Sequence, residues 1–193
     1  MNAFLQLFWQ LCLFRIGPER VPTFSTFVLV VACANIAVSA LAGLVGPFAE
    51  RPSAAFALPV MHAAVIGAST WLVLLAKGLQ QRFTATFVAL LGTDALITGL
   101  SLPLSAVLRP SDAPNLIDLL ASVAQLGLLI WWITVAGHVF ARALEIARGQ
   151  GIAVASFVML TSLMFNYSVI PPPIEPAPFD PPTAQTEQVE TTP

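Results

Sequence analysis

Residues 83–108 read FTATFVALLGTDALITGLSLPLSAVL, a mostly apolar stretch in which Asp94 is the only ionisable residue. About 20 predominantly apolar residues are enough to cross a lipid bilayer as one helix, so this stretch predicts a membrane span. Asp94 then lies about 17 Å from the start of the span, near the centre of the bilayer. An ionisable group at that depth is costly, and it normally faces a bundle interior or a functional path.

The rest of the chain has the same character. Hydrophobic residues make up 57% of the 193 residues and charged residues only 9%. A soluble domain carries about 25% charged residues, so this chain cannot cover itself with a solvated surface, and lipid must be the solvent for much of it. The formal net charge of −2 leaves no basic patch. Nucleic acid is therefore excluded as an expected partner, and the lipid bilayer is the first partner expected.

Five stretches have the length of a spanning helix, and charged residues with Pro or Gly separate them. They are residues 24–48, 54–76, 83–108, 117–140 and 151–170. The fold class predicted from this pattern is an all-α membrane protein, a bundle of five transmembrane helices. The chain divides into a cytoplasmic amphipathic segment (1–20), the five-span bundle (21–170) and a Pro-rich acidic periplasmic tail (171–193).

The N-terminal segment predicts a short amphipathic helix. Asn2, Gln6 and Gln10 recur every four residues and form one polar stripe, and apolar side chains cover the remaining faces. We expect this helix to lie in the cytoplasmic interface with Trp9 at headgroup level. The alternative is a frayed terminus that packs on the bundle.

The C-terminal tail has a different composition from the bundle. Residues 171–193 hold eight of the sixteen prolines and four acidic residues, and they contain no Lys or Arg. The first half should favour polyproline II and the second half should be disordered. We expect a solvated spacer, with a ligand for an aromatic groove as the alternative.

The distribution of Lys and Arg predicts the orientation. With the N-terminus in the cytoplasm, six of the eight basic residues are cytoplasmic: Arg15, Arg20, Lys77, Arg82, Arg142 and Arg148. Only Arg51 and Arg109 then lie outside. This asymmetry agrees with the positive-inside rule and places the C-terminus outside. The expected location is the inner membrane of a bacterium.

A polar layer is expected near the middle of the bilayer. At a rise of 1.5 Å per residue, Asn35 in the first span and Thr161 and Ser162 in the fifth reach nearly the depth of Asp94. His62 in the second span lies at a slightly more external level. In one interpretation Asp94 and His62 form a proton or cation relay. In the other, a neutral Asp94 donates a hydrogen bond to Asn35 or to a backbone carbonyl and only orients the helices.

Nothing in the sequence indicates an enzyme, a metal or a cofactor. Cys12 and Cys33 are isolated in apolar sequence, and His62 and His138 fall at opposite depths. No recognised nucleophile, phosphate-binding or dinucleotide-binding motif occurs. We expect His138 to serve as a capping or interfacial residue beside Arg142.

Small residues and prolines within the spans give further expectations. Glycines such as Gly92 let helix backbones approach closely, which favours a compact bundle or an oligomer. Trp131 and Trp132 lie too deep for an interfacial belt and are expected to pack inside, with lining of a groove as the alternative. Pro59 and Pro103 should kink or break their helices locally.

Two segments carry a resemblance to a known family. They are LCLFRIGPERVPTFS (11–25), before the first span, and RFTATFVALLGTDALI (82–97), which opens the third. With the five-span layout, residues 1–170 resemble the bacterial branch of the Yip family, the Ypt-interacting membrane proteins. The resemblance implies a cytoplasmic N-terminal segment, five closely packed spans and a membrane-organising or partner-binding role without catalysis. No functional residue is carried over.

The function predicted from the sequence is that of a non-catalytic scaffold or accessory subunit. It would organise or bind other membrane proteins, or copies of itself, through helix-packing faces and its two soluble ends. The alternative is a small proton-linked transporter or channel component that uses Asp94.

Overall fold

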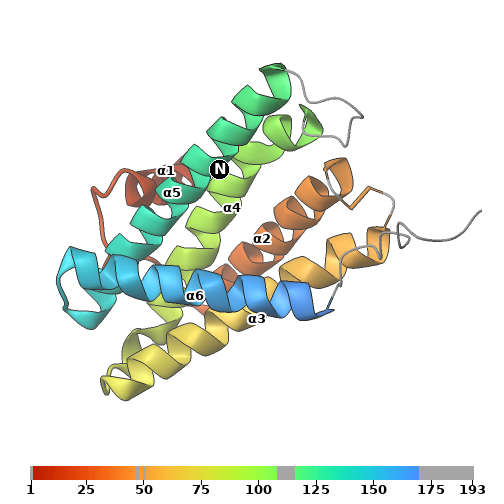
Figure 1. Cartoon of the computed structure of the whole chain (residues 1–193). Coiled ribbons are helices and arrows are strands. Elements are labelled where there is room, and N and C mark those ends of the chain that lie inside the picture. The colour runs from red at the N-terminus through yellow and green to blue at the C-terminus, as the bar shows by residue number, and fades with distance from the viewer. Residues whose placement is uncertain (1, 47, 50, 108–115, 170–193) are drawn as a thin grey trace, which may run out of the picture.

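The computed structural model describes residues 2–46, 48–49, 51–107 and 116–169, and these residues are almost entirely helical (Figure 1). The elements in chain order are α1 (Asn2–Cys12), η1 (Pro18–Arg20), α2 (Ser25–Val45), α3 (Pro52–Ala76), η2 (Gln80–Arg82), α4 (Phe83–Val107), α5 (Leu116–Leu144) and α6 (Arg148–Val169). Helices α2 to α6 are long and apolar enough to cross a membrane, which indicates a multi-pass membrane protein.

The five predicted stretches and the five long helices coincide, so the predicted number of helices long and apolar enough to cross a membrane is confirmed for the described part of the chain. The ends differ by a few residues. Helix α5 continues beyond Phe140 to Leu144 because Ala141, Ala143 and Leu144 are buried in the bundle. Helices α3 and α4 run through Pro59 and Pro103, so neither proline breaks its helix. The predicted tail (171–193) lies outside the described residues.

Helix α4 is the centre of the bundle. It packs against α1, α2, α3 and α5. Half of its most apolar 18-residue stretch is buried inside the protein, against 17–28% of the corresponding stretches of the other four long helices. Residues Val88 to Leu91 of α4 are completely enclosed and belong to the main hydrophobic core. The helix that carries Asp94 is therefore the one with the least access to lipid.

Two ion pairs tie together the end of the bundle that holds the α1–α2 linker, the α3–α4 connection and the α5–α6 turn. We call this the basic end, because it carries Arg15, Arg20, Lys77, Arg82, Arg142 and Arg148. Arg82 Nη2 lies 2.5 Å from Glu145 Oε1, and Arg142 Nη2 lies 2.7 Å from Glu19 Oε1. Burial raises the pKa of Glu19, but its backbone hydrogen bond and the charges of Arg142 and Arg20 outweigh burial and lower the pKa below its usual value. The opposite end of the bundle is the far end.

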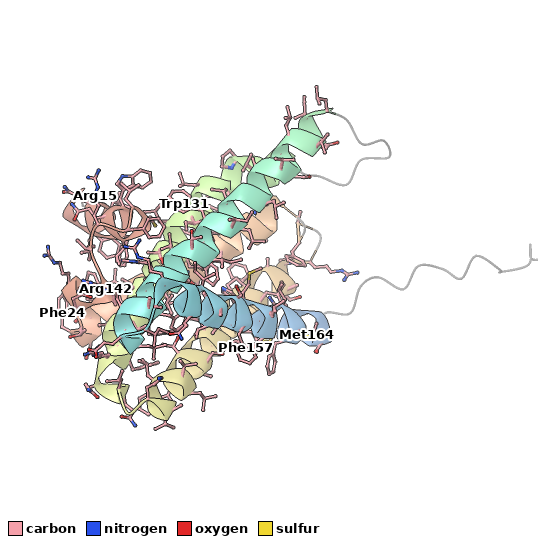
Figure 2. The ribbon with its side chains drawn as sticks, turned by 60° about the vertical axis from the view of Figure 1, so that its left-hand side comes forward. Arg15, Phe24, Trp131, Arg142, Phe157 and Met164 are labelled. Atoms are coloured by element: carbon pink, nitrogen blue, oxygen red, sulfur yellow. The ribbon has the colours of Figure 1, made fainter. Side chains whose placement is uncertain are left out.

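Helices α5 and α6 touch at the basic end and then diverge (Figures 1 and 2). The contact point is a pair of glycines. A Cβ atom added to Gly151 would lie 2.2 Å from the carbonyl oxygen of Gly137, and one added to Gly137 would lie 2.6 Å from the side chain of Ile152. Only residues without a side chain allow the two backbones to approach this closely. Because the closest contact is near one end, the far-end halves of the two helices separate.

Helix α1 packs against the bundle. Phe8, Leu11 and Cys12 are buried, and an added Cβ atom at Gly92 of α4 would lie 2.0 Å from the Phe8 ring. Trp131 Nε1 of α5 also donates a hydrogen bond to the carbonyl oxygen of Cys12, at 3.2 Å. Burial raises the pKa of the Cys12 thiol to about 12. The expected helix is therefore present, and its apolar face is used within the chain.

Candidate functional site

The candidate site is built around Asp94 on the central helix α4. Its side chain is buried, with 7% of the residue exposed. Asn35 of α2, which is completely buried, points its amide nitrogen at two acceptors: Asp94 Oδ2 at 2.8 Å and the carbonyl oxygen of Leu91 at 3.0 Å. Because a backbone carbonyl can only accept, the nitrogen rather than the oxygen of Asn35 must face it. Asp94 Oδ2 is thus held as an acceptor.

In one of the two interpretations drawn from the sequence, a neutral Asp94 donates a hydrogen bond to Asn35 or to a backbone carbonyl, whereas in the structure Asn35 Nδ2 donates to Asp94 Oδ2. Asn35 is the donor, and its own Oδ1 is buried without a hydrogen-bond partner among the described residues. Since Oδ2 of Asp94 accepts from Asn35, the free position for a proton on the carboxyl group is Oδ1. The two oxygens of Asp94 therefore have separate roles.

The second oxygen of Asp94 faces His62 of α3. His62 Nε2 lies 3.9 Å from Asp94 Oδ1. The other ring nitrogen, Nδ1, lies 2.6 Å from the hydroxyl oxygen of Ser162 on α6. A hydroxyl can donate or accept, so this contact is compatible with either neutral tautomer of His62. Four helices thus contribute to one polar cluster, which consists of Asn35, His62, Asp94 and Ser162.

Four of the five residues that the sequence placed in a polar layer come together in this cluster: Asp94, Asn35, His62 and Ser162. Thr161 does not join them. Its hydroxyl bonds back to the carbonyl oxygen of Phe157 on its own helix, at 2.9 Å. Its neighbour Ser162 turns inward instead, because successive residues of a helix point about 100° apart.

Two adjoining cavities open beside the cluster, and His62 lines both. The first, of about 460 Å³, also contains Asp94 in its wall and lies between α3, α4, α5 and α6; we call it the α5/α6 cleft. Its remaining lining residues are Ile97, Thr98, Ser101, Gln125, Leu126, Leu128, Leu129, Trp132, Met159, Ser162, Leu163 and Asn166. The second cavity, of about 510 Å³, extends toward α2.

The cavities lie on only one side of Asp94. The residues of α4 that line them are Asp94 itself and others further along the helix, toward the far end. Toward the basic end, Leu90 and Leu91 of α4 pack with Val31, Val135 and Val139 in the hydrophobic core, and all five are at most 1% exposed. Asp94 is therefore accessible from the far end and sealed from the basic end.

His138, Trp131 and Trp132 were also singled out in the sequence, and they lie outside the polar cluster. His138 Nε2 lies 3.3 Å from the carbonyl oxygen of Ile16, and its ring meets Phe14 edge-on, so His138 fastens the α1–α2 linker to α5. Trp131 holds α1, whereas the adjacent Trp132 lines the α5/α6 cleft. Gly137 and Gly151, which set the crossing of α5 and α6, were not singled out in the sequence.

The chemistry available to this site is acid–base and electrostatic. Across the described ranges, no three His, Cys, Asp or Glu side chains lie close enough together to hold a metal ion. The site contains one carboxyl group: its Oδ2 accepts a hydrogen bond from Asn35, and its Oδ1 faces His62 beside a cavity. Such a group can bind and release a proton or a small cation.

Comparison with protein-family models, with curated proteins and with solved structures finds no match to this chain.

Proposed function

We propose that this chain is a small proton-linked transporter or channel component in which Asp94 is the proton-binding group. One observation carries this proposal: Asn35 holds Asp94 Oδ2, while Asp94 Oδ1 faces His62 and the α5/α6 cleft. A carboxyl group that served only to orient helices would need no cavity beside it. Intramembrane acids that face a cavity commonly mark ion paths.

The one-sided cavity supports a carrier that is open toward the far end. Alternating access requires a second state in which the seal toward the basic end opens and the cleft closes. The divergence of α5 and α6 from their glycine contact supports a hinge at that position, because rocking about one contact point would let the far-end half of α6 move relative to α5 (Figure 2).

The location expected for this function is the inner membrane of a bacterium with the basic end in the cytoplasm. Support comes from the concentration of cationic residues at the basic end, as the positive-inside rule requires. In that orientation α1 lies on the cytoplasmic side, in or near the interface, and the cavities open toward the periplasmic side.

The scaffold function stays a prediction, as does the resemblance to the Yip family. The N-terminal helix was one of the two ends expected to bind a partner, yet Phe8 and Leu11 of its apolar face are buried against the bundle. Leu5 and Trp9 are the larger exposed side chains that this helix still offers. No described contact favours the scaffold over the proton-linked function.

Proton flux into liposomes tests the proposed function. The purified full-length chain is reconstituted with a pH-sensitive dye inside, and a potassium diffusion potential drives protons inward. We expect flux above that of protein-free liposomes, and we expect Asp94→Asn to reduce it at least about tenfold because an amide cannot exchange a proton. Thr161→Ala is the matched control, since Thr161 adjoins Ser162 on α6 but bonds only to its own helix.

The result that would overturn the proposal is equally definite. Wild-type flux no higher than that of empty liposomes, or unchanged flux in Asp94→Asn, would exclude a proton path through Asp94.

A further inference from the structure

We propose that the α5/α6 cleft binds a protonated amine with an apolar body, which enters sideways from the lipid between α5 and α6. This inference rests on the proposed function and names the class of its substrate. Three features of the cleft carry it: the sign of its charge, the kind of hydrogen-bonding atoms in its wall, and the apolar surface that leads into it.

The charge of the cleft favours a cation. Asp94 is the only carboxylate in its described lining, and no Lys or Arg lies there. His62, from α3, is the only other titratable group facing Asp94 in the described part of the chain. The neighbouring groups from α2, α5 and α6 are the uncharged side chains of Asn35, Gln125 and Ser162. A phosphate or carboxylate ligand would meet the like charge of Asp94 with no Lys or Arg in the described lining to neutralise it, which disfavours a phospholipid headgroup as the occupant.

The hydrogen-bonding atoms favour a donor. Besides the open oxygen of Asp94, the cleft is lined by Gln125 of α5 and Asn166 of α6. Gln125 Oε1 and Asn166 Oδ1 are both buried and have no partner among the described residues. Buried acceptors without partners are costly, and N–H groups of an ammonium are the donors that would satisfy them at the lowest cost beside a carboxylate.

The walls favour an apolar body of moderate size. Leu128, Met159 and Trp132 line the cleft together with Asp94. An aromatic face attracts a cation, and a volume of about 460 Å³ is within the usual range of about 300–1,000 Å³ for small-molecule sites.

The path of entry is lateral. Leu126, Leu129 and Leu163 line the cleft and are also 55%, 38% and 38% exposed on the outside of the bundle. They lie on the far-end halves of α5 and α6, which diverge from the turn that joins them (Figure 2). In a membrane this surface faces lipid, so an amphiphilic amine can slide its apolar body between the two helices while its ammonium group reaches Asp94.

The proton and the ammonium then compete for one group. An ammonium binds the ionised carboxylate, so binding to protonated Asp94 releases its proton, and a lower pH weakens binding. A proton on His62 would place a second positive charge 3.9 Å from Asp94 Oδ1 and weaken binding further. Competition of this kind exchanges a proton for an amine, and in this way the site would couple the movement of protons to the movement of amines.

Equilibrium dialysis of the full-length chain in lipid nanodiscs tests the proposal, with empty nanodiscs as the blank. The probe is 1-adamantylammonium, and 1-adamantanol is a neutral match of nearly the same shape. We expect saturable binding of the ammonium at one site per chain and none of the alcohol. Asp94→Asn should weaken binding at least about tenfold, the loss typical of a charge-assisted hydrogen bond. Glu145→Gln is the control, because it removes a carboxylate at the basic end.

A second variant keeps the test decisive if Asp94→Asn fails to fold. Leu126→Trp fills the cleft and leaves Asp94 intact, and it should also weaken binding of the ammonium. Equal binding of alcohol and ammonium, or unchanged affinity in Asp94→Asn or Leu126→Trp, would overturn the proposal. Saturable binding without proton flux would refute only the proposed proton path, whereas Asp94-dependent flux without binding would refute only the amine site.

Discussion

Asn35 shows how a single residue can divide one carboxyl group into two functional sides. Its amide nitrogen is fixed between two acceptors, Leu91 O and Asp94 Oδ2. The nitrogen donates to both acceptors, so Asp94 Oδ2 is held as an acceptor. Asp94 Oδ1, which faces His62 and the cleft, is the oxygen that is more open to proton exchange.

Replacing Asn35 should therefore destabilise the bundle through Asp94. We expect Asn35→Leu to lower the free energy of unfolding by between about 0.6 kcal/mol, the average for an interhelical hydrogen bond in a membrane, and about 3 kcal/mol, the upper cost of an unpaired buried group. The measurement is a double-mutant cycle with Asp94→Leu in a reversible unfolding assay in bilayers or mixed micelles.

The cycle should be non-additive. In the Asp94→Leu background, Asn35→Leu no longer strands a buried carboxylate and should cost clearly less than in the wild type. If the two changes add to within about 0.5 kcal/mol, the contact between the two side chains contributes nothing to stability.

At the scale of elements, glycines, which have no side chain, determine how closely the helices approach one another. Gly92 leaves room on α4 for the ring of Phe8, and Gly137 with Gly151 lets α5 touch α6. The contact of Phe8 with Gly92 docks α1, which is too short to cross a membrane. The contact of Gly137 with Gly151 places the pivot of α6 near the basic end, and the cleft exists because the helices separate beyond it.

Adding one methyl group to Gly92 should undock α1. In Gly92→Ala the new Cβ would lie 2.0 Å from the Phe8 ring, so the ring must leave its place. Cys12 is buried on the same helix, and burial raises its pKa to about 12, so it should be inert to maleimide in the wild type and reactive in Gly92→Ala. Labelling is measured in a Cys33→Ser background because Cys33 is exposed.

Gly99→Ala is the matched control on the same helix. Its added Cβ would meet only Val38 Cγ1, at an ordinary contact distance of 3.9 Å. Cys12 should therefore stay protected. If Gly92→Ala also leaves Cys12 protected, the fit of Phe8 over Gly92 does not hold α1 in place.

At the scale of the whole molecule, the two ends of the bundle differ in both charge and packing. Toward the basic end, the hydrophobic core seals Asp94, and two cross-helix ion pairs and the glycine contact of α5 and α6 join the helices around a separate cavity of about 540 Å³. The two cavities beside Asp94 lie toward the far end. The ends of α5 and α6 are separated there (Figure 1). A charged end that is sealed from Asp94 and a far end that is open to it suit a protein that presents its site to one leaflet of a membrane.

The proposed orientation can be measured with single cysteines in a cysteine-free background. Gly149 lies at the basic end, where an added Cβ meets nothing within 4 Å, and Ser53 is exposed at the far end. We expect a membrane-impermeant maleimide to label Ser53→Cys in intact cells and Gly149→Cys only after permeabilisation, because the cationic end is retained in the cytoplasm. The reverse pattern would place the cavities on the cytoplasmic side.

The sequence by itself determined the five spans, and it put Asp94, Asn35 and His62 at compatible depths. Both follow from local rules: the bilayer sets the length of a span, and the fixed rise of a helix converts residue number into depth. The contacts between helices depend on how each helix is rotated about its own axis and on where it crosses its neighbours. Hydropathy encodes neither of these when a helix is apolar on all sides. Tertiary structure alone decided that Ser162 rather than Thr161 meets His62, and that Gly137 packs on Gly151. It likewise decided that a cleft opens beside Asp94, because a cavity is a property of several helices packed together and of none taken singly.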